Sequence, residues 1–247
     1  MSTDYIKEIR FTDKIKPEEY LLDIPAVRHL ITHKVLPISH SVTIFVGENG
    51  TGKSTLLEAV AVACGFNAEG GSKNFNFATA KTHSRLHGNI RISKRKFPRD
   101  GFFLRAESFY NVASNIDELD RQPSCSPPII DSYGGVSLHE QSHGESFMAL
   151  VKNRFGGDGL YILDEPEAAL SPMRLLTLMA HINALVEKNS QFIISTHSPI
   201  LMALPGAQIL ELSQNGIEEK DYKDTEHYRI TKAFLDNPER MLKYLLD

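Results

Sequence analysis

The segment GENGTGKS, at residues 47–54, has the residue types and spacing of a phosphate-binding loop. It matches the pattern GxxxxGK[ST] and lies between an apolar run that predicts a strand and a segment that predicts a helix. Glycines let backbone N–H groups curve around a phosphate at the positive end of the following helix. Lys53 can reach the terminal phosphate oxygens, and the Ser54 hydroxyl is a suitable Mg²⁺ ligand. The residues predicted to bind nucleotide here are Gly47, Glu48, Asn49, Gly50, Thr51, Gly52, Lys53, Ser54 and Thr55.

A pair of acidic residues follows the apolar run LYIL at residues 160–163. A buried strand there would deliver Asp164 to the carboxyl edge of a parallel sheet, where α/β folds bind their ligands. We therefore predict that Asp164 holds Mg²⁺, directly or through water, and that Glu165 acts as general base on a water molecule. Taken alone, such a pair is more often two solvated acids at a strand end. The phosphate-binding loop upstream favours the catalytic interpretation.

Two further segments are weaker signals when each is taken alone. In QSHGES, residues 141–146, a Ser and a Gly at a helix N-terminus can donate hydrogen bonds to a phosphate, but Ser142 can equally be a helix cap. In ISTHSP, residues 194–199, His197 at a strand end can contact a terminal phosphate or a water molecule, or have a purely structural role. These two segments become informative through their order along the chain relative to the other motifs.

The four motifs GENGTGKS, QSHGES, LYILDEPEAALSP and ISTHSP occur in an order that resembles the ABC-type ATPases, over residues 20–213. The resemblance implies ATP and Mg²⁺ as cofactors, hydrolysis through Glu165 and His197, and two sites shared between the head-to-tail protomers of a homodimer. It also implies that one subunit's signature segment caps the phosphate held by Lys53 of the other. The residues assigned to that segment are Ser142, His143, Gly144 and Glu145.

The resemblance also assigns a third metal position and a branch of the family. Glu107, in FFLRAESF, falls where the family usually has a glutamine that touches Mg²⁺, beside the expected ligands Ser54 and Asp164. Glu145, where transporters tend to have Gln, resembles the RecF- and SMC-like branch that acts in DNA repair and chromosome maintenance. More narrowly, the chain resembles small standalone bacterial ATPases described as predicted ABC- or AAA-type ATPases.

The elements that must position these residues predict an α/β fold. Short buried strands alternate with helices, which indicates a mainly parallel core sheet of the P-loop NTPase type. Strands are expected at 4–11, 41–46, from 101 onward, 160–163, 191–195, 207–213 and 216–220. Helices are expected at 53–64, 109–121, 144–155, after Pro172, and over 225–246.

These elements are expected to form one domain over residues 1–247. The motif order requires Lys53 and His197 to converge on one phosphate, so the intervening segments are expected as lobes of that domain. An antiparallel β-rich lobe is predicted at about 66–106, a short helical and loop lobe at about 107–143, and a helical tail at 225–247. Apolar residues of the tail recur near helical spacing and are expected to dock on the core. They are Phe234, Leu235, Met241, Leu242 and Leu245.

Composition excludes several classes of protein. The chain has 247 residues, 41% of them hydrophobic and 23% charged, with a net charge of −4. These values exclude a disordered chain, a disulfide-stapled mini-protein and a wholly basic nucleic-acid binder. No signal region or membrane-spanning run is evident, so we expect a cytoplasmic protein without membrane insertion.

One part of the chain is locally basic, and it can be a nucleic-acid contact or merely a solvated face. Its cationic residues are Lys81, Arg85, Arg91, Lys94, Arg95, Lys96, Arg99 and Arg105. The sequence thus favours an ATPase outside transport that acts on a nucleic-acid or protein partner. Two alternatives remain open: the nucleotide-binding subunit of an ABC transporter, and a nucleotide-dependent switch in a defence system.

Overall fold

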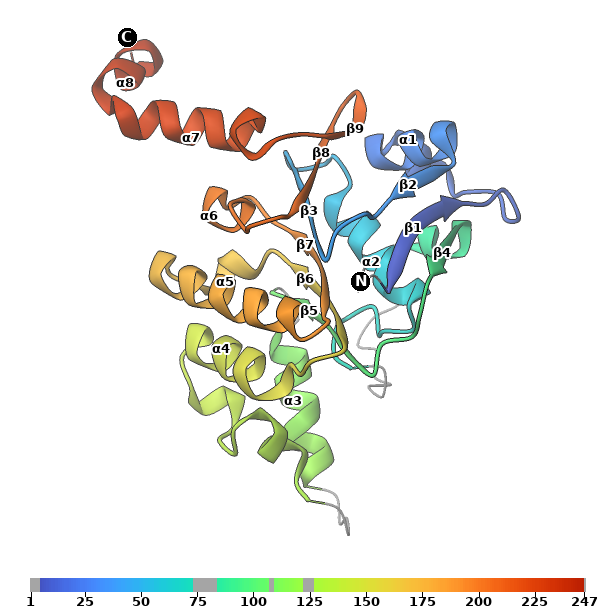
Figure 1. Ribbon diagram of the computed structural model, residues 1–247, viewed down its shortest axis with the longest axis vertical. Coiled ribbons are helices and arrows are strands. Elements are labelled where there is room, and N and C mark those ends of the chain that lie inside the picture. Colours follow the sequence, from blue (N-terminus) through green and yellow to red (C-terminus); the bar gives the residue numbers. More distant parts are fainter. Residues whose placement is uncertain (1–4, 73–83, 107–108, 122–126, 247) are drawn as a thin grey trace.

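A six-stranded sheet forms the centre of the protein (Figure 1). The computed structural model describes residues 5–72, 84–106, 109–121 and 127–246. The strand order is β5-β6-β7-β3-β8-β9; neighbouring strands run parallel except for the last pair, which is antiparallel. The strands are β3 (Val42–Gly47), β5 (Asp100–Arg105), β6 (Gly159–Asp164), β7 (Gln191–Ser195), β8 (Gln208–Ser213) and β9 (Gly216–Glu219). The predicted α/β fold with a mainly parallel sheet is confirmed.

Helices cover both faces of this sheet, because its central strands are apolar on both sides. In β3, Ile44 and Val46 point into one hydrophobic cluster, whereas Phe45 between them points into the other. The first cluster is covered by α3 (Phe109–Asp120), α4 (His143–Arg154), α5 (Pro172–Glu187) and α6 (Pro199–Met202). The second is covered by α1 (Pro25–His33) and α2 (Lys53–Ala63). Continuous burial of this kind is typical of parallel strands.

A smaller antiparallel sheet packs against the outer side of α2. It has the order β2-β1-β4 and consists of β1 (Ile6–Phe11), β2 (Val35–Pro37) and β4 (Ile90–Lys94). Within the segment of about 66–106, β4 therefore joins the smaller sheet and β5 joins the larger one. Helix α1 and strand β2 were not among the elements predicted from the sequence. The signal for α1 was Pro25 at its first position.

Short 3-10 turns connect these elements. They lie at Glu19–Asp23, Arg85–Asn89, Ile129–Tyr133, Leu138–Glu140, Pro166–Ala169 and Tyr222–Asp224. Two of them, with α3, make up the described part of the segment of about 107–143. The prediction of a separate helical and loop lobe over about 107–143 stays a prediction.

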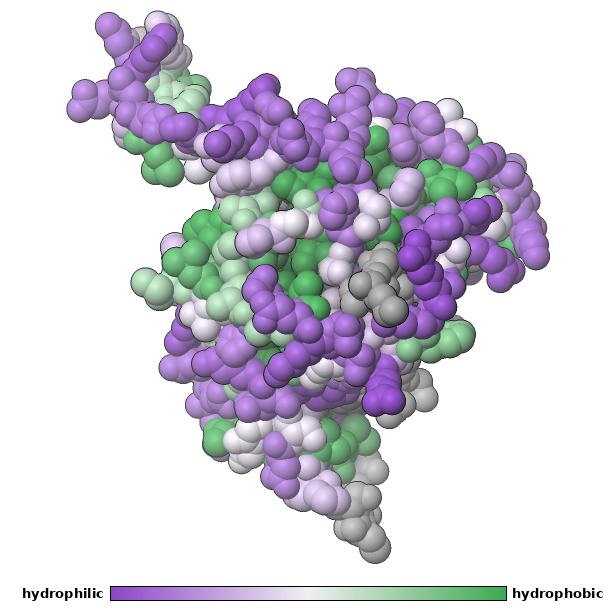
Figure 2. All heavy atoms as spheres, viewed as in Figure 1, coloured by the Kyte–Doolittle hydropathy of each residue, from purple (hydrophilic) through white to green (hydrophobic). Residues whose placement is uncertain are grey.

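The C-terminal tail is two helices that project from the rest of the protein (Figure 1). They are α7 (Glu226–Asp236) and α8 (Pro238–Leu246), separated at Pro238, which cannot continue the hydrogen-bond ladder of α7. No residue of either helix is buried; Leu235 and Leu245 are 70% and 72% exposed. Figure 2 shows hydrophilic and hydrophobic surface side by side on this projection.

The expectation that the apolar tail residues dock on the core is therefore wrong. Spacing shows that a helix has an apolar face, but it does not show what that face meets. Within the described ranges, no helix combines the length and the apolar character needed to cross a membrane.

The basic residues of the segment around 81–105 do not act as one group. Arg105 is largely buried beneath the larger sheet's edge, where it is paired with acidic residues. Arg85 lies 3.3 Å from Glu18, and the ammonium group of Lys96 lies over the ring of Tyr5. Lys81 lies outside the described residues. A nucleic-acid contact there stays a prediction.

Candidate functional site

The phosphate-binding loop, residues 47–54, connects the end of β3 to the start of α2. Its backbone takes positive φ angles at Gly50 (82°) and Gly52 (98°), which only glycine adopts without strain. The Lys53 ammonium folds back over the loop and donates to the carbonyls of Gly47 (2.7 Å) and Glu48 (3.0 Å). Burial lowers the pKa of Lys53. The loop therefore places the buried Lys53 ammonium beside a curved backbone segment, an arrangement that suits the binding of a phosphate.

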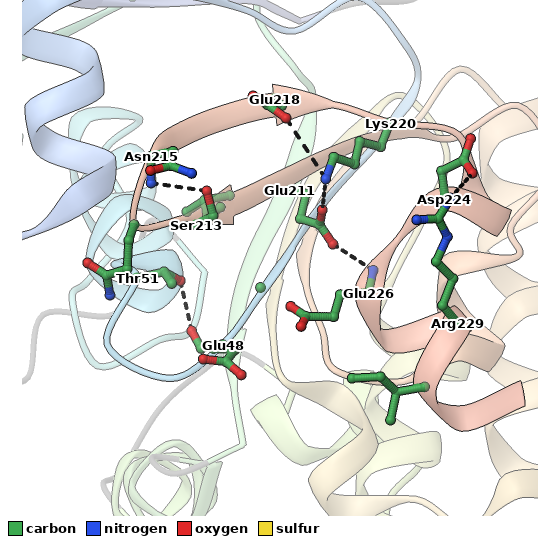
Figure 3. A pocket seen from close by; sticks show the side chains of 14 residues that line it. Glu48, Thr51, Glu211, Ser213, Asn215, Glu218, Lys220, Asp224, Glu226 and Arg229 are labelled. Carbon is green, nitrogen blue, oxygen red and sulfur yellow. Dashed lines mark hydrogen bonds and ion pairs between the residues drawn. The ribbon is translucent and has the colours of Figure 1, made fainter. Parts of the chain in front are cut away.

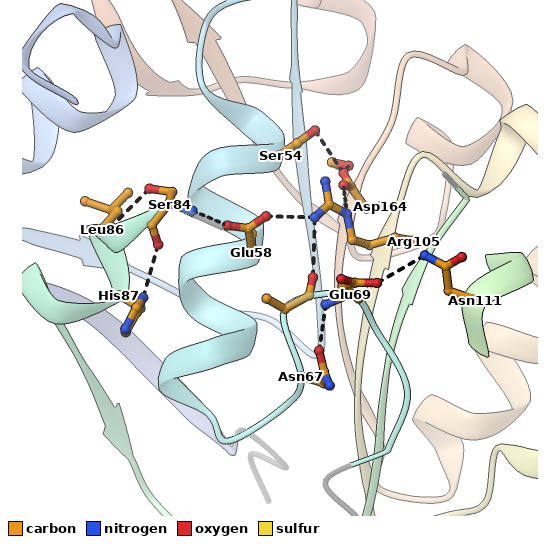
Figure 4. Close-up of polar contacts among 12 residues, drawn as sticks. Ser54, Glu58, Asn67, Glu69, Ser84, Leu86, His87, Arg105, Asn111 and Asp164 are labelled. Carbon is orange, nitrogen blue, oxygen red and sulfur yellow. Dashed lines mark hydrogen bonds and ion pairs between the residues drawn. The ribbon is translucent and has the colours of Figure 1, made fainter. Parts of the chain in front are cut away.

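Asp164 stands at the carboxyl end of β6, facing this loop (Figure 4). Its Oδ1 accepts hydrogen bonds from the hydroxyls of Ser54 (3.1 Å) and Ser195 (2.5 Å). The sheet register explains the gathering, because Asp164 pairs with Arg105 on one side and with Ser195 on the other. Three parallel strands thus end at one level and bring their terminal polar side chains together.

Arg105 is a site residue that sequence reasoning missed, since it was counted only in the basic stretch. Its Nε lies 3.5 Å from Asp164 Oδ2, and its Nη1 donates to the Glu58 carboxylate at 2.7 Å (Figure 4). Its side chain is 19% exposed, against 10% for Glu58 and 8% for Asp164. The sequence signal that could have identified Arg105 was its position, because it ends strand β5 just as Asp164 ends strand β6.

The expected catalytic pair also comes together. Glu165 has a left-handed backbone (φ 49°, ψ 54°), which is uncommon for a non-glycine residue. Its carboxylate lies 3.4 Å from His197 Nε2. The His197 backbone N–H donates to the carboxylate of Glu167 at 2.5 Å. Burial raises the pKa of Glu167, whereas burial and the nearby Lys53 charge lower the pKa of His197.

The signature segment, residues 142–145, begins α4 as a capped helix. The Glu145 carboxylate accepts hydrogen bonds from the Ser142 hydroxyl (2.5 Å) and from the Ser142 backbone N–H (3.1 Å). Gly144 is buried, and a Cβ there would lie 2.3 Å from Arg174 Nη1 and 2.9 Å from the Ala169 carbonyl oxygen. Ser142, His143 and Glu145 remain exposed. Within one chain the segment therefore has the capping role, and its exposed side chains are available to a second molecule.

Two cavities border the phosphate-binding loop. One of about 190 Å³ is lined by Ser54, Ala106, His143, Asp164, Glu165, Ala168 and Ala169. It thus joins the expected metal ligands, the expected base and one signature residue within a single chain. The other, of about 660 Å³, lies between residues 47–51, the β8–β9 hairpin and the start of α7 (Figure 3).

The metal position suits Mg²⁺ held jointly with a nucleotide. Ser54 and Asp164 supply one hydroxyl and one carboxylate, and Mg²⁺ typically takes one or two carboxylates with substrate phosphates and water. Among the described residues there is no group of three His, Cys, Asp or Glu that could hold a metal by itself. Glu107 lies outside the described ranges, so its role as a ligand stays a prediction.

A glycine-rich loop between strand and helix, its lysine, and an aspartate at the end of β6, one strand removed from β3, define a P-loop nucleotide-binding domain. Residues 26–116 match a family model described as "AAA domain", and residues 136–203 match one described as "AAA domain, putative AbiEii toxin, Type IV TA system". A galactose/methyl galactoside import ATP-binding protein, MglA 2 of Photobacterium profundum, is 27% identical over 213 residues. That match covers 74% of this chain and 40% of the relative, so the chain spans well under half of that protein.

Solved structures with the same fold are ABC proteins. A putative metal-chelate type ABC transporter aligns over 91% of this chain and 88% of its own, with a TM-score of 0.51 and 12% identity. The ATP-binding cassette MJ1267 covers 98% of both chains, with a TM-score of 0.50 and 14% identity. CbiO1 from Clostridium perfringens covers 99% of this chain and all of its own, with a TM-score of 0.50 and 17% identity. The motif order of this chain is similar to that of ABC-type ATPases, and the solved structures of such proteins share its fold.

Proposed function

We propose that this domain binds ATP with Mg²⁺, hydrolyses it in the cytoplasm, and closes as a head-to-tail homodimer around two nucleotides. The observation that carries the proposal is the convergence of Lys53, the Ser54–Asp164 pair and the Glu165–His197 pair around one loop. These groups come from three separate segments, and together they meet the requirements of phosphoryl transfer to water.

The geometry supports a proposed role for each residue. Lys53 neutralises the terminal phosphates, and Ser54 and Asp164 hold Mg²⁺, which supplies charge neutralisation on the phosphate oxygens when bound. Glu165 orients a water molecule and accepts its proton, and His197 donates a hydrogen bond to the terminal phosphate. The 3.4 Å separation of Glu165 and His197 lets both groups act on the same reacting centre.

The signature segment, residues 142–145, has its proposed role in the dimer. Ser142, His143 and Glu145 are exposed, so their side chains are accessible to a second subunit. In the proposed dimer they contact the terminal phosphate bound by the partner subunit, so closure requires ATP and opening follows its hydrolysis.

The test uses Glu165→Gln, which removes the base and retains the shape of the side chain. With saturating ATP and Mg²⁺ we expect light scattering to show a stable dimer, and a monomer with ADP. Lys53→Ala in the same background is the control and should stay monomeric with ATP. A monomeric Glu165→Gln protein that demonstrably binds ATP would overturn the shared-site mechanism.

We further propose a nucleic-acid or protein partner rather than a transport role, supported by Glu145 in the signature and the short segment of about 107–143. The second candidate, a transporter's nucleotide-binding subunit, is favoured by the similarity to the import protein MglA 2. Titrating duplex DNA against the ATP-bound protein at two salt concentrations, with fractionation of cell membranes, separates the two. Salt-dependent binding supports the first, and membrane association that needs a co-expressed membrane protein supports the second.

A further inference from the structure

The first turn of the projecting tail touches the candidate active site. His227, on α7, places its Nε2 3.0 Å from Nδ1 of His197. The two rings lie 5.2 Å apart between centroids. The opposite nitrogen of His197, Nε2, faces Glu165. One imidazole therefore connects the tail to the expected catalytic pair.

The start of α7 is held firmly, although the rest of the tail is exposed. The Glu211 carboxylate on β8 accepts a hydrogen bond from the Glu226 backbone N–H at 2.9 Å and forms an ion pair with Lys220 (Figure 3). Thr225 is fully buried, and its hydroxyl donates to the Tyr222 carbonyl at 2.9 Å. The turn that carries His227 is therefore fixed to the sheet independently of α8.

The proton between the two imidazoles can lie in one of two places. The 3.0 Å contact requires one of the two nitrogens to be an unprotonated acceptor, and burial lowers the pKa of both His197 and His227, which favours neutral rings with one N–H each. If His197 Nδ1–H donated, the buried His227 Nδ1 would also have to carry a proton, and it has no hydrogen-bond partner among the described residues. The bare His197 Nε2 would then face the Glu165 carboxylate, lone pair against lone pair.

The reverse arrangement avoids the repulsion between His197 Nε2 and the Glu165 carboxylate. When His227 Nε2–H donates, His227 Nδ1 is an unprotonated acceptor that lacks a partner among the described residues, as the N–H would in the other arrangement. His197 then carries its proton on Nε2 and can donate it toward Glu165 or a phosphate oxygen. The hydrogen-bond network therefore selects one tautomer.

We propose that His227 is a positioning residue that fixes His197 in the Nε2–H tautomer, so that the C-terminal tail completes the ATPase site. The effect on hydrolysis rests on the proposed function, whereas the tautomer itself exists without nucleotide. The tail contributes no group to the reacting atoms; it sets the direction and protonation of one that does.

The first experiment reads the tautomer directly in the nucleotide-free protein. Long-range ¹H–¹⁵N spectra of ¹⁵N-histidine-labelled protein, assigned with His197→Gln, should show His197 protonated on Nε2. In His227→Ala the His197 signal should move toward a mixture of the two tautomers, and in His227→Gln, whose amide can donate from nearly the same position, the Nε2–H form should return. A wild-type His197 protonated on Nδ1, or an unchanged His197 in His227→Ala, would overturn the proposal.

The second experiment measures its catalytic consequence. We expect His227→Ala to lower kcat for ATP about ten-fold with KM changed less than two-fold, as loss of one hydrogen bond to an active group allows. His227→Gln should recover most of kcat. His181→Ala, a partly buried histidine on α5 away from the site, is the matched control and should retain wild-type kcat and thermal stability. A rise in KM for ATP without a fall in kcat would contradict a role for His227 in positioning His197. If the wild type does not hydrolyse ATP, the proposed function fails while the tautomer measurement still decides this inference.

Discussion

At the scale of single residues, the site depends on balanced charge in a confined space. Asp164 and Glu58 share one cation, the Arg105 guanidinium, in a largely buried setting. Asp164 also accepts two hydroxyl hydrogen bonds. A buried carboxylate is tolerated only when it is paired and hydrogen-bonded, so Arg105 stabilises the Asp164 carboxylate, the proposed metal ligand.

Replacement of Arg105 by Met should lower the free energy of unfolding by about 3 kcal/mol, because two carboxylates lose their common counter-charge. Urea denaturation without nucleotide measures the change. The double variant Arg105→Met/Glu58→Gln should lose much less than the sum of the two single variants, since Glu58 would no longer be an unpaired charge. Strict additivity of the two losses would show that the Arg105–Glu58 pair contributes little.

At the scale of secondary-structure elements, the position of the phosphate-binding loop depends on how closely β3 approaches β8. Gly47 pairs with Leu212 in the sheet register and has a φ of 137°. A Cβ at Gly47 would lie 2.1 Å from the Leu212 carbonyl oxygen. Gly50 has a positive φ as well, but nothing lies within 4 Å of a Cβ built there.

These two glycines make a matched pair of variants. Gly47→Ala should lower the free energy of unfolding by about 3 kcal/mol, because backbone strain and a clash with β8 add together. Gly50→Ala should cost about 1 kcal/mol, since only the left-handed backbone is strained. Thermal or urea unfolding of the nucleotide-free protein distinguishes them. Equal losses would mean that contact with β8 does not fix the strand end.

At the scale of the whole molecule, the tail is joined to the sheet only at its beginning. The sheet is enclosed by two hydrophobic clusters, one on each face, and neither includes a residue of α7 or α8. The apolar side chains of the tail therefore contribute little to the stability of this chain on its own.

A comparison of two leucine truncations tests this directly. Leu178→Ala, on α5 and fully buried, should lower the free energy of unfolding by about 3 kcal/mol through lost burial and a new cavity. Leu235→Ala, on α7 and 70% exposed, should change it by less than about 0.5 kcal/mol. A large loss for Leu235→Ala in a monomer would show that the tail packs on the body in solution.

The sequence predicted most of the elements because their signals are local. The apolar runs became β3, β6 and β7, and the pattern GxxxxGK[ST] fell between strand and helix as expected. The sequence did not predict α1, because the mixture of polar and apolar residues there is a weak helix signal. The prediction that the tail docks on the core was wrong. The sequence also placed Arg105 in a surface group, since a charged residue at a strand end is usually solvated.

Residue types and spacing by themselves determined the α/β fold, the phosphate-binding loop, the acidic pair and the strand-end histidine. They could do so because loop geometry and strand burial depend on short stretches of sequence. Only the tertiary structure decided which side chains meet across those segments. The register of β5, β6 and β7 joined Arg105, Asp164 and Ser195, and the anchoring of α7 brought His227 against His197. Such contacts depend on the packing of distant elements, which no local pattern specifies.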